Sequence, residues 1–271
     1  LYTPEMTALL IDLDGVLYET DEPLPGAAAT IEWLREQGVP HVFLTNTTSR
    51  PRAAIVEKLA GMQIDVVEAD ILTPPVAAAE WLLKNGSGPA ALFVAPATIE
   101  EFAALELAAP GDTAVAAVVV GDYGERWNFA ELNRAFRLLM NEPRPALVAL
   151  GMTRYWQAED GLRLDTGPFV TALSHASGVE PVVLGKPAQP FFATALPRLG
   201  VSAEEALMIG DDIQGDIGGA QTAGINGALV RTGKFRDGDL DSDIRPNLIL
   251  DSFADVPDRW ADIIDVLRPT G

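Results

Sequence analysis

The sequence contains no cysteine and only two histidines, His41 and His175, among its 271 residues. It therefore cannot form disulfide bonds, thiolate metal sites or a cysteine nucleophile, and a histidine-rich zinc site is disfavoured. No apolar run approaches the roughly 20 residues that a membrane-spanning helix needs, and no basic, apolar prefix typical of a signal peptide opens the sequence. These absences predict a cytoplasmic protein with no membrane partner.

Positive charge is also scarce, because 19 Lys and Arg residues stand against 39 Asp and Glu residues, a formal net charge of −20. Such a surface repels nucleic acid and anionic membranes at long range, so we expect no nucleic-acid partner. We interpret most of these charges as a solvated surface. Because a phosphate-bearing substrate would be repelled as well, any anion site must hold local positive charge from a metal ion or a well-placed lysine.

The apolar segments alternate between strand-like and helix-like patterns along most of the sequence. Short apolar runs bounded by turn residues predict buried strands at 8–11, 39–44, 181–184, 206–209, 227–230 and 248–250. Helical patterns separate most of these runs, and alternating strands and helices favour an α/β fold with a doubly wound parallel sheet.

The middle third of the sequence has an α/β alternation of its own. Strands are expected at 91–95, 114–120 and 147–150, and Phe129, Leu132, Phe136 and Leu139 have the spacing of an amphipathic helix. We therefore predict an inserted domain at 75–181, with the core formed by residues 1–74 and 182–271.

Carboxylates follow two of the predicted core strands at the point where each strand ends. Asp12 and Asp14 close the first strand, and Asp211 follows a later one, with Asp216 five residues beyond it. The alternative is an ordinary turn, because Asp and Gly dominate turns for backbone reasons alone. A buried carboxylate is costly unless it is compensated, so acids at the ends of core strands favour a bound cation or a hydrogen-bond network.

Polar groups follow two further strands. Thr45 and Asn46 come directly after the strand at 39–44 and can donate hydrogen bonds to an oxyanion, whereas Ser49 fits a helix N-cap. Lys186 stands at a strand-to-helix junction, where the charge of its ammonium would add to the partial positive charge of the helix N-terminus and favour a bound anion. The alternative for Lys186 is an ordinary surface lysine.

The carboxyl ends of strands in an open parallel sheet share one crevice, so these residues can meet there. Oxygen ligands from carboxylates suit Mg²⁺, a hard cation that often shares its ligands with substrate phosphate oxygens. The sequence has no GxxxxGK[ST] loop, which argues against a nucleotide-phosphate cradle of that type.

These motifs, in this order, resemble the four motifs of the haloacid dehalogenase (HAD) superfamily phosphatases. The resemblance spans nearly the whole chain, and it implies a Rossmann-like core with a C2-type cap domain inserted between the second and third motifs. Finer features resemble the branch that contains phospholysine, phosphohistidine and inorganic pyrophosphate phosphatase, although that branch often has serine where this chain has Asp14. The segments that carry the finer resemblance begin at Phe136, Thr166, Gly185, Gly219 and Val230.

The resemblance also implies roles for the residues that match the motifs. Asp12 would be the nucleophile and form an aspartyl phosphate, and Asp14 would be the general acid and base. Thr45 and Asn46 would bind the phosphoryl oxygens, and Lys186 would offset negative charge on them and on Asp12. Mg²⁺ would be held by Asp12, Asp211, Asp216 and the backbone carbonyl of Asp14, with Asp212 as a further candidate to orient metal-bound water.

The loops of the insert offer candidates for substrate recognition. Arg154, Tyr155 and Trp156 could contact the substrate, pack within the insert or form a subunit contact. We predict a small phosphorylated substrate that a phosphatase hydrolyses, and the resemblance suggests a homodimer through the cap. A dehalogenase or phosphonatase on the same scaffold, and a phosphate-binding module without turnover, are the alternatives. Phosphoesters, pyrophosphate and P–N bonds all stay open as substrates.

Overall fold

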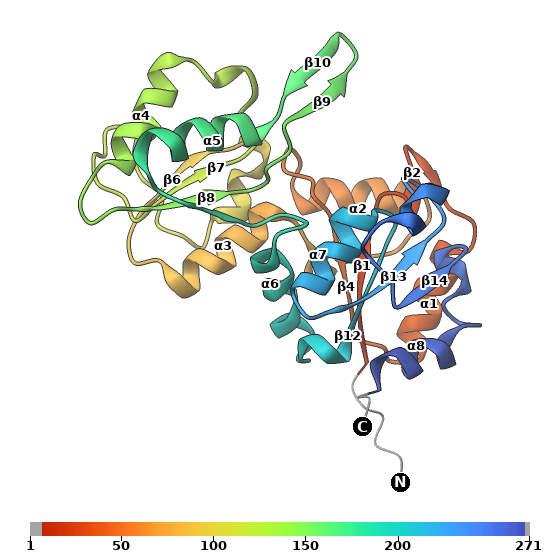
Figure 1. Cartoon of the computed structure of the whole chain (residues 1–271). Helices are drawn as coiled ribbons and strands as arrows, with labels where there is room; N and C mark the ends of the chain where they lie inside the picture. Colours follow the sequence, from red (N-terminus) through yellow and green to blue (C-terminus); the bar gives the residue numbers. More distant parts are fainter. Residues whose placement is uncertain (1–6, 269–271) are drawn as a thin grey trace. The chain divides into compact units, whose positions relative to one another are not determined.

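The computed structural model describes residues 7–268, so the ends of the predicted core ranges, 1–6 and 269–271, lie outside the described residues. Two compact units each contain a parallel sheet (Figure 1). The first unit comprises Leu1–Thr45, Arg52–Leu72 and Lys186–Gly271, and the second comprises Asn46–Pro51 and Thr73–Gly185. The chain thus leaves the first unit and later returns to it.

The first unit is built on a six-stranded parallel sheet with the strand order β14-β13-β12-β1-β4-β5. Its strands are β1 (Ala8–Asp12), β4 (His41–Leu44), β5 (Ile71–Leu72), β12 (Ala206–Gly210), β13 (Asn226–Val230) and β14 (Leu248–Leu250). Its helices are α1 (Ala27–Glu36), α2 (Arg52–Gly61), α6 (Gln189–Leu199), α7 (Gly219–Thr222) and α8 (Trp260–Leu267). The doubly wound sheet that the alternation of strands and helices predicts is therefore confirmed.

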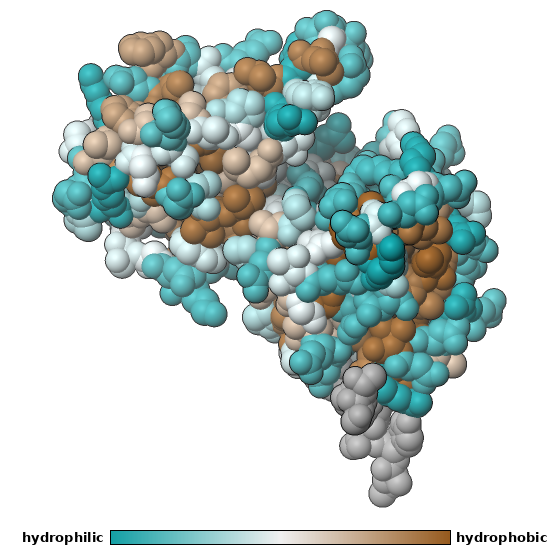
Figure 2. Space-filling view, viewed as in Figure 1, coloured by the Kyte–Doolittle hydropathy of each residue, from teal (hydrophilic) through white to brown (hydrophobic). Residues whose placement is uncertain are grey.

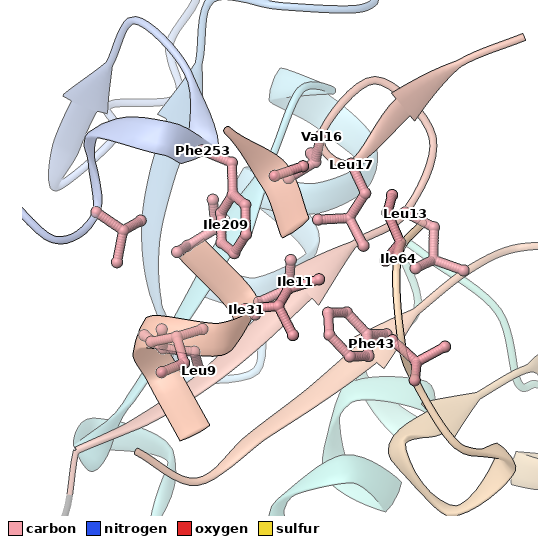
Figure 3. Close-up of a cluster of buried hydrophobic side chains, with 14 of the residues drawn as sticks. Leu9, Ile11, Leu13, Val16, Leu17, Ile31, Phe43, Ile64, Ile209 and Phe253 are labelled. Carbon is pink, nitrogen blue, oxygen red and sulfur yellow. The ribbon is translucent and has the colours of Figure 1, made fainter. Parts of the chain in front are cut away.

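A continuous apolar cluster fills one face of this sheet (Figure 3). Alternate residues of β1, Leu9 and Ile11, point into it, because successive side chains of a strand face opposite sides of the sheet. Ile31 of α1, Phe43 of β4 and Phe253 complete its centre, and all are at most 1 % exposed. At roughly 25 cal/mol per Å² of apolar surface, burial of this cluster is a main source of the stability of the core.

The topology brings three strand ends together. β1 is central and pairs in parallel with β12 on one side and with β4 on the other, with Ile11 opposite Ile209 and Asp12 opposite Leu44. Parallel neighbours end at the same edge of a sheet, so the residues that follow β4 and β12 lie beside Asp12.

Short elements follow two of these strands. After β1 the chain forms a small antiparallel hairpin from β2 (Tyr18–Glu19) and β3 (Glu22–Pro23). After β12 it forms η5 (Ile213–Gly218), a π-helical segment that leads into α7. Such π-helical turns are rare and occur often at functional sites.

The second unit contains a four-stranded parallel sheet with the order β11-β8-β7-β6. Its strands are β6 (Ala90–Phe93), β7 (Ala117–Val120), β8 (Ala146–Ala149) and β11 (Pro181–Val183), and its helices are α3 (Pro74–Asn85), α4 (Phe129–Leu139) and α5 (Thr166–Ser177). Side chains of α4 and α5 cover one face of the sheet and form a separate apolar cluster with it. The insert therefore has its own core, as its sequence predicts.

Three local features of the second unit differ from the sequence-based expectation. The strand at 181–184 was expected in the core sheet, but β11 pairs with β8, and the first unit resumes only at Lys186. Phe129 was expected on the buried face of its helix, yet it is 84 % exposed, because it lies in the first turn while Ala135, Leu138 and Leu139 face the core. Periodicity identifies the helix but not how far along it the contact surface extends.

The third difference is a hairpin where a loop was expected. β9 (Tyr155–Ala158) and β10 (Gly161–Leu164) form a two-stranded antiparallel sheet. The hairpin carries exposed apolar side chains, which Figure 2 shows among hydrophilic neighbours. Across residues 7–268, no helix combines the length and apolar character that crossing a membrane requires.

Candidate active site

Three buried carboxylates meet at the carboxyl edge of the core sheet. Asp12 ends β1, Asp211 follows β12, and Asp216 lies in η5. One carboxylate oxygen of each lies within 4.8 Å of the others. All three residues are at most 4 % exposed. Such a concentration of buried negative charge requires compensation.

Lys186 supplies part of that compensation. Its Nζ lies 2.6 Å from Oδ1 of Asp12 and 2.6 Å from Oδ1 of Asp216, and its side chain is only 6 % exposed. Burial opposes the charged form of this lysine, but the carboxylates of Asp12 and Asp216 outweigh it and raise the pKa of the ammonium. Lys186 is therefore a fixed positive charge and not a surface lysine.

One ammonium does not balance three carboxylates. Burial raises the pKa of Asp12, and repulsion from Asp216 raises it further, against the opposing effect of Lys186. Burial likewise raises the pKa of Asp211 to about 6, although the backbone N–H of Lys234 acts in the opposite direction. Both shifts report negative charge that the protein alone does not fully stabilise.

The two oxygens of Asp211 have different surroundings. Oδ2 accepts a hydrogen bond of 2.7 Å from the backbone N–H of Lys234. Oδ1 is buried and has no hydrogen-bond partner among residues 7–268. A buried polar atom without a partner costs about 1–3 kcal/mol, so this oxygen is suited to accept a cation or a proton.

This donor set fits a hard divalent cation. All the donors are carboxylate oxygens, one of them lacks a partner, and the cluster of three acids and one lysine has an excess of negative charge. Mg²⁺ prefers oxygen ligands of this kind. The buried Thr45 follows β4 directly, and its N–H donates a hydrogen bond to the carbonyl of Leu72. Its predicted role in binding the phosphoryl oxygens stays a prediction.

Two stretches of the chain match models of known families. Residues 9–107 match the haloacid dehalogenase-like hydrolases, and residues 183–256 match the HAD-hydrolase-like family. Human phospholysine phosphohistidine inorganic pyrophosphate phosphatase is 35 % identical over 263 residues, which cover 96 % of this chain and 93 % of that protein. The chain belongs to the HAD hydrolase family.

Two further HAD relatives cover the chain almost completely. The bovine haloacid dehalogenase-like hydrolase domain-containing protein 2 is 38 % identical over 255 residues, which cover 94 % of this chain and 95 % of that protein. The solved structure of p-nitrophenyl phosphatase from Archaeoglobus fulgidus has a TM-score of 0.82 at 27 % identity, and the match covers 94 % of this chain and 99 % of that one. The fold is thus a Rossmann-like HAD core with an inserted α/β cap of the C2 type, and the chain is a HAD-family phosphatase.

The HAD core brings together four of the residues that the sequence singled out. Asp12, Lys186, Asp211 and Asp216 form one cluster. The side chain of Asp14 is exposed and lies outside the group of carboxylates that could share an ion. This placement suits an acid that exchanges protons, but its role stays a prediction.

Two predicted substrate residues belong to the second unit. Asn46 begins the segment Asn46–Pro51, and its Oδ1 lies 3.4 Å from the position that a Cβ on Gly185 would take. Arg154 is exposed and its guanidinium lies 5.8 Å from the ring centre of Tyr155. Their predicted roles in substrate binding stay predictions.

Lys234 contributes to the site but was not identified as a site residue from the sequence. Lys234 binds Asp211 through its backbone N–H, and its Nζ lies 3.6 Å from Oδ2 of Asp212. Burial acts to raise the pKa of Asp212, but hydrogen bonds from Gly215 and Gln214 and the charge of Lys234 lower it. The only sequence signal for Lys234 was the Gly-Lys pair after the strand at 227–230.

Proposed function

We propose that this HAD-family phosphatase is Mg²⁺-dependent and hydrolyses small phosphorylated compounds through an aspartyl-phosphate intermediate. The observation that carries the proposal is the meeting of Asp12, Asp211 and Asp216 with Lys186 at one edge of the sheet. A phosphoryl group entering this site would meet a nucleophile and fixed positive charge. Phosphoryl transfer depends mainly on such positioning and electrostatics.

In the first half of the reaction, a carboxylate oxygen of Asp12 attacks phosphorus while the bond from phosphorus to the leaving oxygen breaks. Asp14 donates its proton to that leaving oxygen. In the second half, Asp14 takes a proton from a water molecule, and the resulting hydroxide attacks phosphorus. The phosphorus–Asp12 bond then breaks, which releases inorganic phosphate and restores the Asp12 carboxylate.

Asp12, Asp211 and Asp216, with the backbone carbonyl of Asp14, would hold Mg²⁺. When bound, the ion supplies positive charge that draws the phosphoryl group to the carboxylates and offsets their repulsion. Lys186 keeps its contacts with Asp12 and Asp216 and so holds the Asp12 carboxylate in place for attack. Thr45 and Asn46 would donate hydrogen bonds to the phosphoryl oxygens.

The C2-type cap, with the predicted boundaries 75–181, would select the substrate. Arg154 is our candidate to contact the substrate, because it is exposed in a loop beside two aromatic residues. The relatives are named as a p-nitrophenyl phosphatase and as a phospholysine phosphohistidine inorganic pyrophosphate phosphatase. We propose phosphoesters and pyrophosphate as the first classes to test, and P–N bonds after them.

We also propose a homodimer formed through the cap. The strands β9 and β10 carry Tyr155, Leu162 and Leu164, which are 51 %, 67 % and 64 % exposed. Their register places Tyr155 opposite Leu164 and Gln157 opposite Leu162, so the three apolar side chains share one face. An isolated two-stranded sheet is marginally stable in water, and a second copy would cover this face. Cytoplasmic location stays a prediction from the sequence.

The test is turnover of a panel of phosphorylated metabolites by the wild type and by Asp12→Asn, with Mg²⁺ and with EDTA. We expect the Asp12→Asn variant to lose at least about 10³-fold in kcat because it lacks the nucleophile. Asp251→Asn, an exposed carboxylate of the same unit, is the matched control and should turn over normally. Folding is checked by circular dichroism.

Each alternative predicts a different result in the same panel. Release of halide from haloacids or cleavage of phosphonates, without phosphoester turnover, would replace the phosphatase proposal. If the protein binds a phosphorylated compound but releases no inorganic phosphate in a single-turnover experiment, it is a binding module. Near-normal turnover by folded Asp12→Asn would refute the nucleophile assignment.

A further inference from the structure

The carboxylate of Glu19 lies outside the acidic cluster but contacts the loop that binds one member of it. Glu19 ends β2, and its Oε1 accepts a hydrogen bond of 2.7 Å from the backbone N–H of Gly233. The next residue, Lys234, donates its backbone N–H to Oδ2 of Asp211, also at 2.7 Å. Two consecutive N–H groups of one loop thus connect Glu19 to Asp211.

The same loop is attached to the segment that follows Asp12. The hydroxyl of Thr232 donates a hydrogen bond to the carbonyl of Gly15. Gly15 in turn donates its N–H to the carbonyl of Tyr18, at 2.7 Å, in the residue before Glu19. The hairpin and the loop therefore form a closed set of contacts around the Asp211 carboxylate.

Packing on this carboxylate leaves little freedom for its Oδ2. A Cβ added to Gly15 would come within 1.9 Å of Oδ2, and one added to Gly233 would come within 2.1 Å. Both glycines also have positive φ values, 80° and 62°, that favour glycine. The backbone encloses Oδ2 on both sides, so a shift of the loop must move or release Asp211.

The hairpin that carries Glu19 is itself held in place. Lys58 of α2 donates to the carbonyl of Thr20 at 2.6 Å and lies 3.1 Å from Oδ1 of Asp21. Its Nζ also lies 4.4 Å from the ring centre of Tyr18. Since Lys58 fixes one side of the hairpin, the Glu19 carboxylate can act as a rigid acceptor for the loop.

We propose that Glu19 is a positioning residue for the metal site. It fixes Gly233 and Lys234 so that the Lys234 N–H holds Oδ2 of Asp211 and leaves the unpartnered Oδ1 free to bind the cation. The inference rests on the metal site of the proposed function. Groups that orient metal ligands through hydrogen bonds change metal affinity about 10- to 100-fold when they are lost, and Glu19 acts one contact further away.

The experiment is a calorimetric titration of the metal-free protein with Mn²⁺, a divalent cation that takes the same oxygen ligands as Mg²⁺. We expect Glu19→Ala to weaken Mn²⁺ binding by about 3- to 10-fold. Glu19→Gln keeps a carbonyl acceptor and should stay within about twofold of the wild type.

Glu22→Ala is the matched control for charge. Glu22 lies opposite Glu19 in the hairpin and is exposed, so this variant removes the same charge without removing the contact with Gly233. It should also stay within about twofold of the wild type. Equal effects of Glu19→Ala and Glu22→Ala would overturn the proposal, because they would show a general charge effect.

Hydrogen exchange at the Lys234 amide provides a readout that needs no metal. Glu19→Ala should speed this exchange, whereas Glu19→Gln and Glu22→Ala should not. If the wild type binds no Mn²⁺, the metal of the proposed function is refuted, and unchanged exchange in Glu19→Ala would separately overturn the positioning role. Should Glu19→Ala fail to fold, Glu19→Asp, one methylene shorter, must show the same two effects.

Discussion

Lys186 Nζ and Asp12 Oδ1 lie 2.6 Å apart, although one residue belongs to the return of the chain to the core and the other to its first strand. Both side chains are only 6 % exposed. The pair exists because β1 is the central strand and because the chain re-enters the first unit at Lys186.

Replacement of Lys186 by Met should both inactivate and destabilise the protein. The ammonium offsets two buried carboxylates, and loss of one partner of a buried ion pair costs about 3–5 kcal/mol. Urea denaturation in EDTA measures this loss, and Mg²⁺ should recover part of it. The control Lys84→Met changes an exposed lysine and should shift stability by less than about 0.5 kcal/mol. Equal stability of the two variants would contradict the role of Lys186.

Replacement of Asp14 by Ala should affect substrates according to their leaving groups. A poor leaving group, such as the alkoxide of an alkyl phosphate, needs a proton in the transition state, so kcat should fall about 10²- to 10⁴-fold. For an activated aryl phosphate, such as p-nitrophenyl phosphate, kcat should fall much less. Steady-state kinetics of the wild type and the variant on both substrates measures the two losses in kcat. Equal losses on the two would count against Asp14 as the general acid.

The metal-free protein should lose stability as the pH rises from about 5 to 7.5. Burial raises the pKa values of Asp12 and Asp211 in the folded state, that of Asp211 to about 6, whereas an unfolded Asp titrates near 3.9. Because the folded state then binds more protons than the unfolded chain, its stability falls with rising pH, here by about 4 kcal/mol for the two groups together.

Urea denaturation across this pH range in EDTA measures that fall. Saturating Mg²⁺ should remove most of the fall, since the bound ion favours ionised carboxylates. Asp211→Asn removes one of the titrating groups and should flatten the metal-free profile. A metal-free stability that rises between pH 5 and 7.5 would contradict the explanation.

Disruption of the apolar face of the β9–β10 hairpin should shift the protein from dimer to monomer. Leu162→Asp places a charge on that face, where Leu162 is 67 % exposed, and would repel its copy across the interface. Multi-angle light scattering over a concentration series measures the shift. Leu83→Asp, at a leucine of α3 that is 56 % exposed, is the control and should leave the dimer intact. A wild type that is monomeric at every concentration would refute the interface.

The sequence by itself determined the fold class and the main members of the acidic cluster. Short apolar runs that end in Asp12 and Asp211 identify strands and their ends from local pattern alone, and the rule for parallel sheets places those ends at one edge. Lys186 was predicted in the same way from its place after a strand. Local patterns sufficed here because each feature depends on residues that are adjacent in the sequence.

Only the tertiary structure decided the features that depend on pairing between distant segments. The pattern of β11 does not say which sheet it joins, and its hydrogen bonds to β8 place it in the second unit. The unpartnered Oδ1 of Asp211 and the contact of Glu19 with Gly233 also arise only when separate loops pack together. Hydrogen-bond partners and buried charge are properties of that packing, and for this reason no pattern of neighbouring residues in the sequence encodes them.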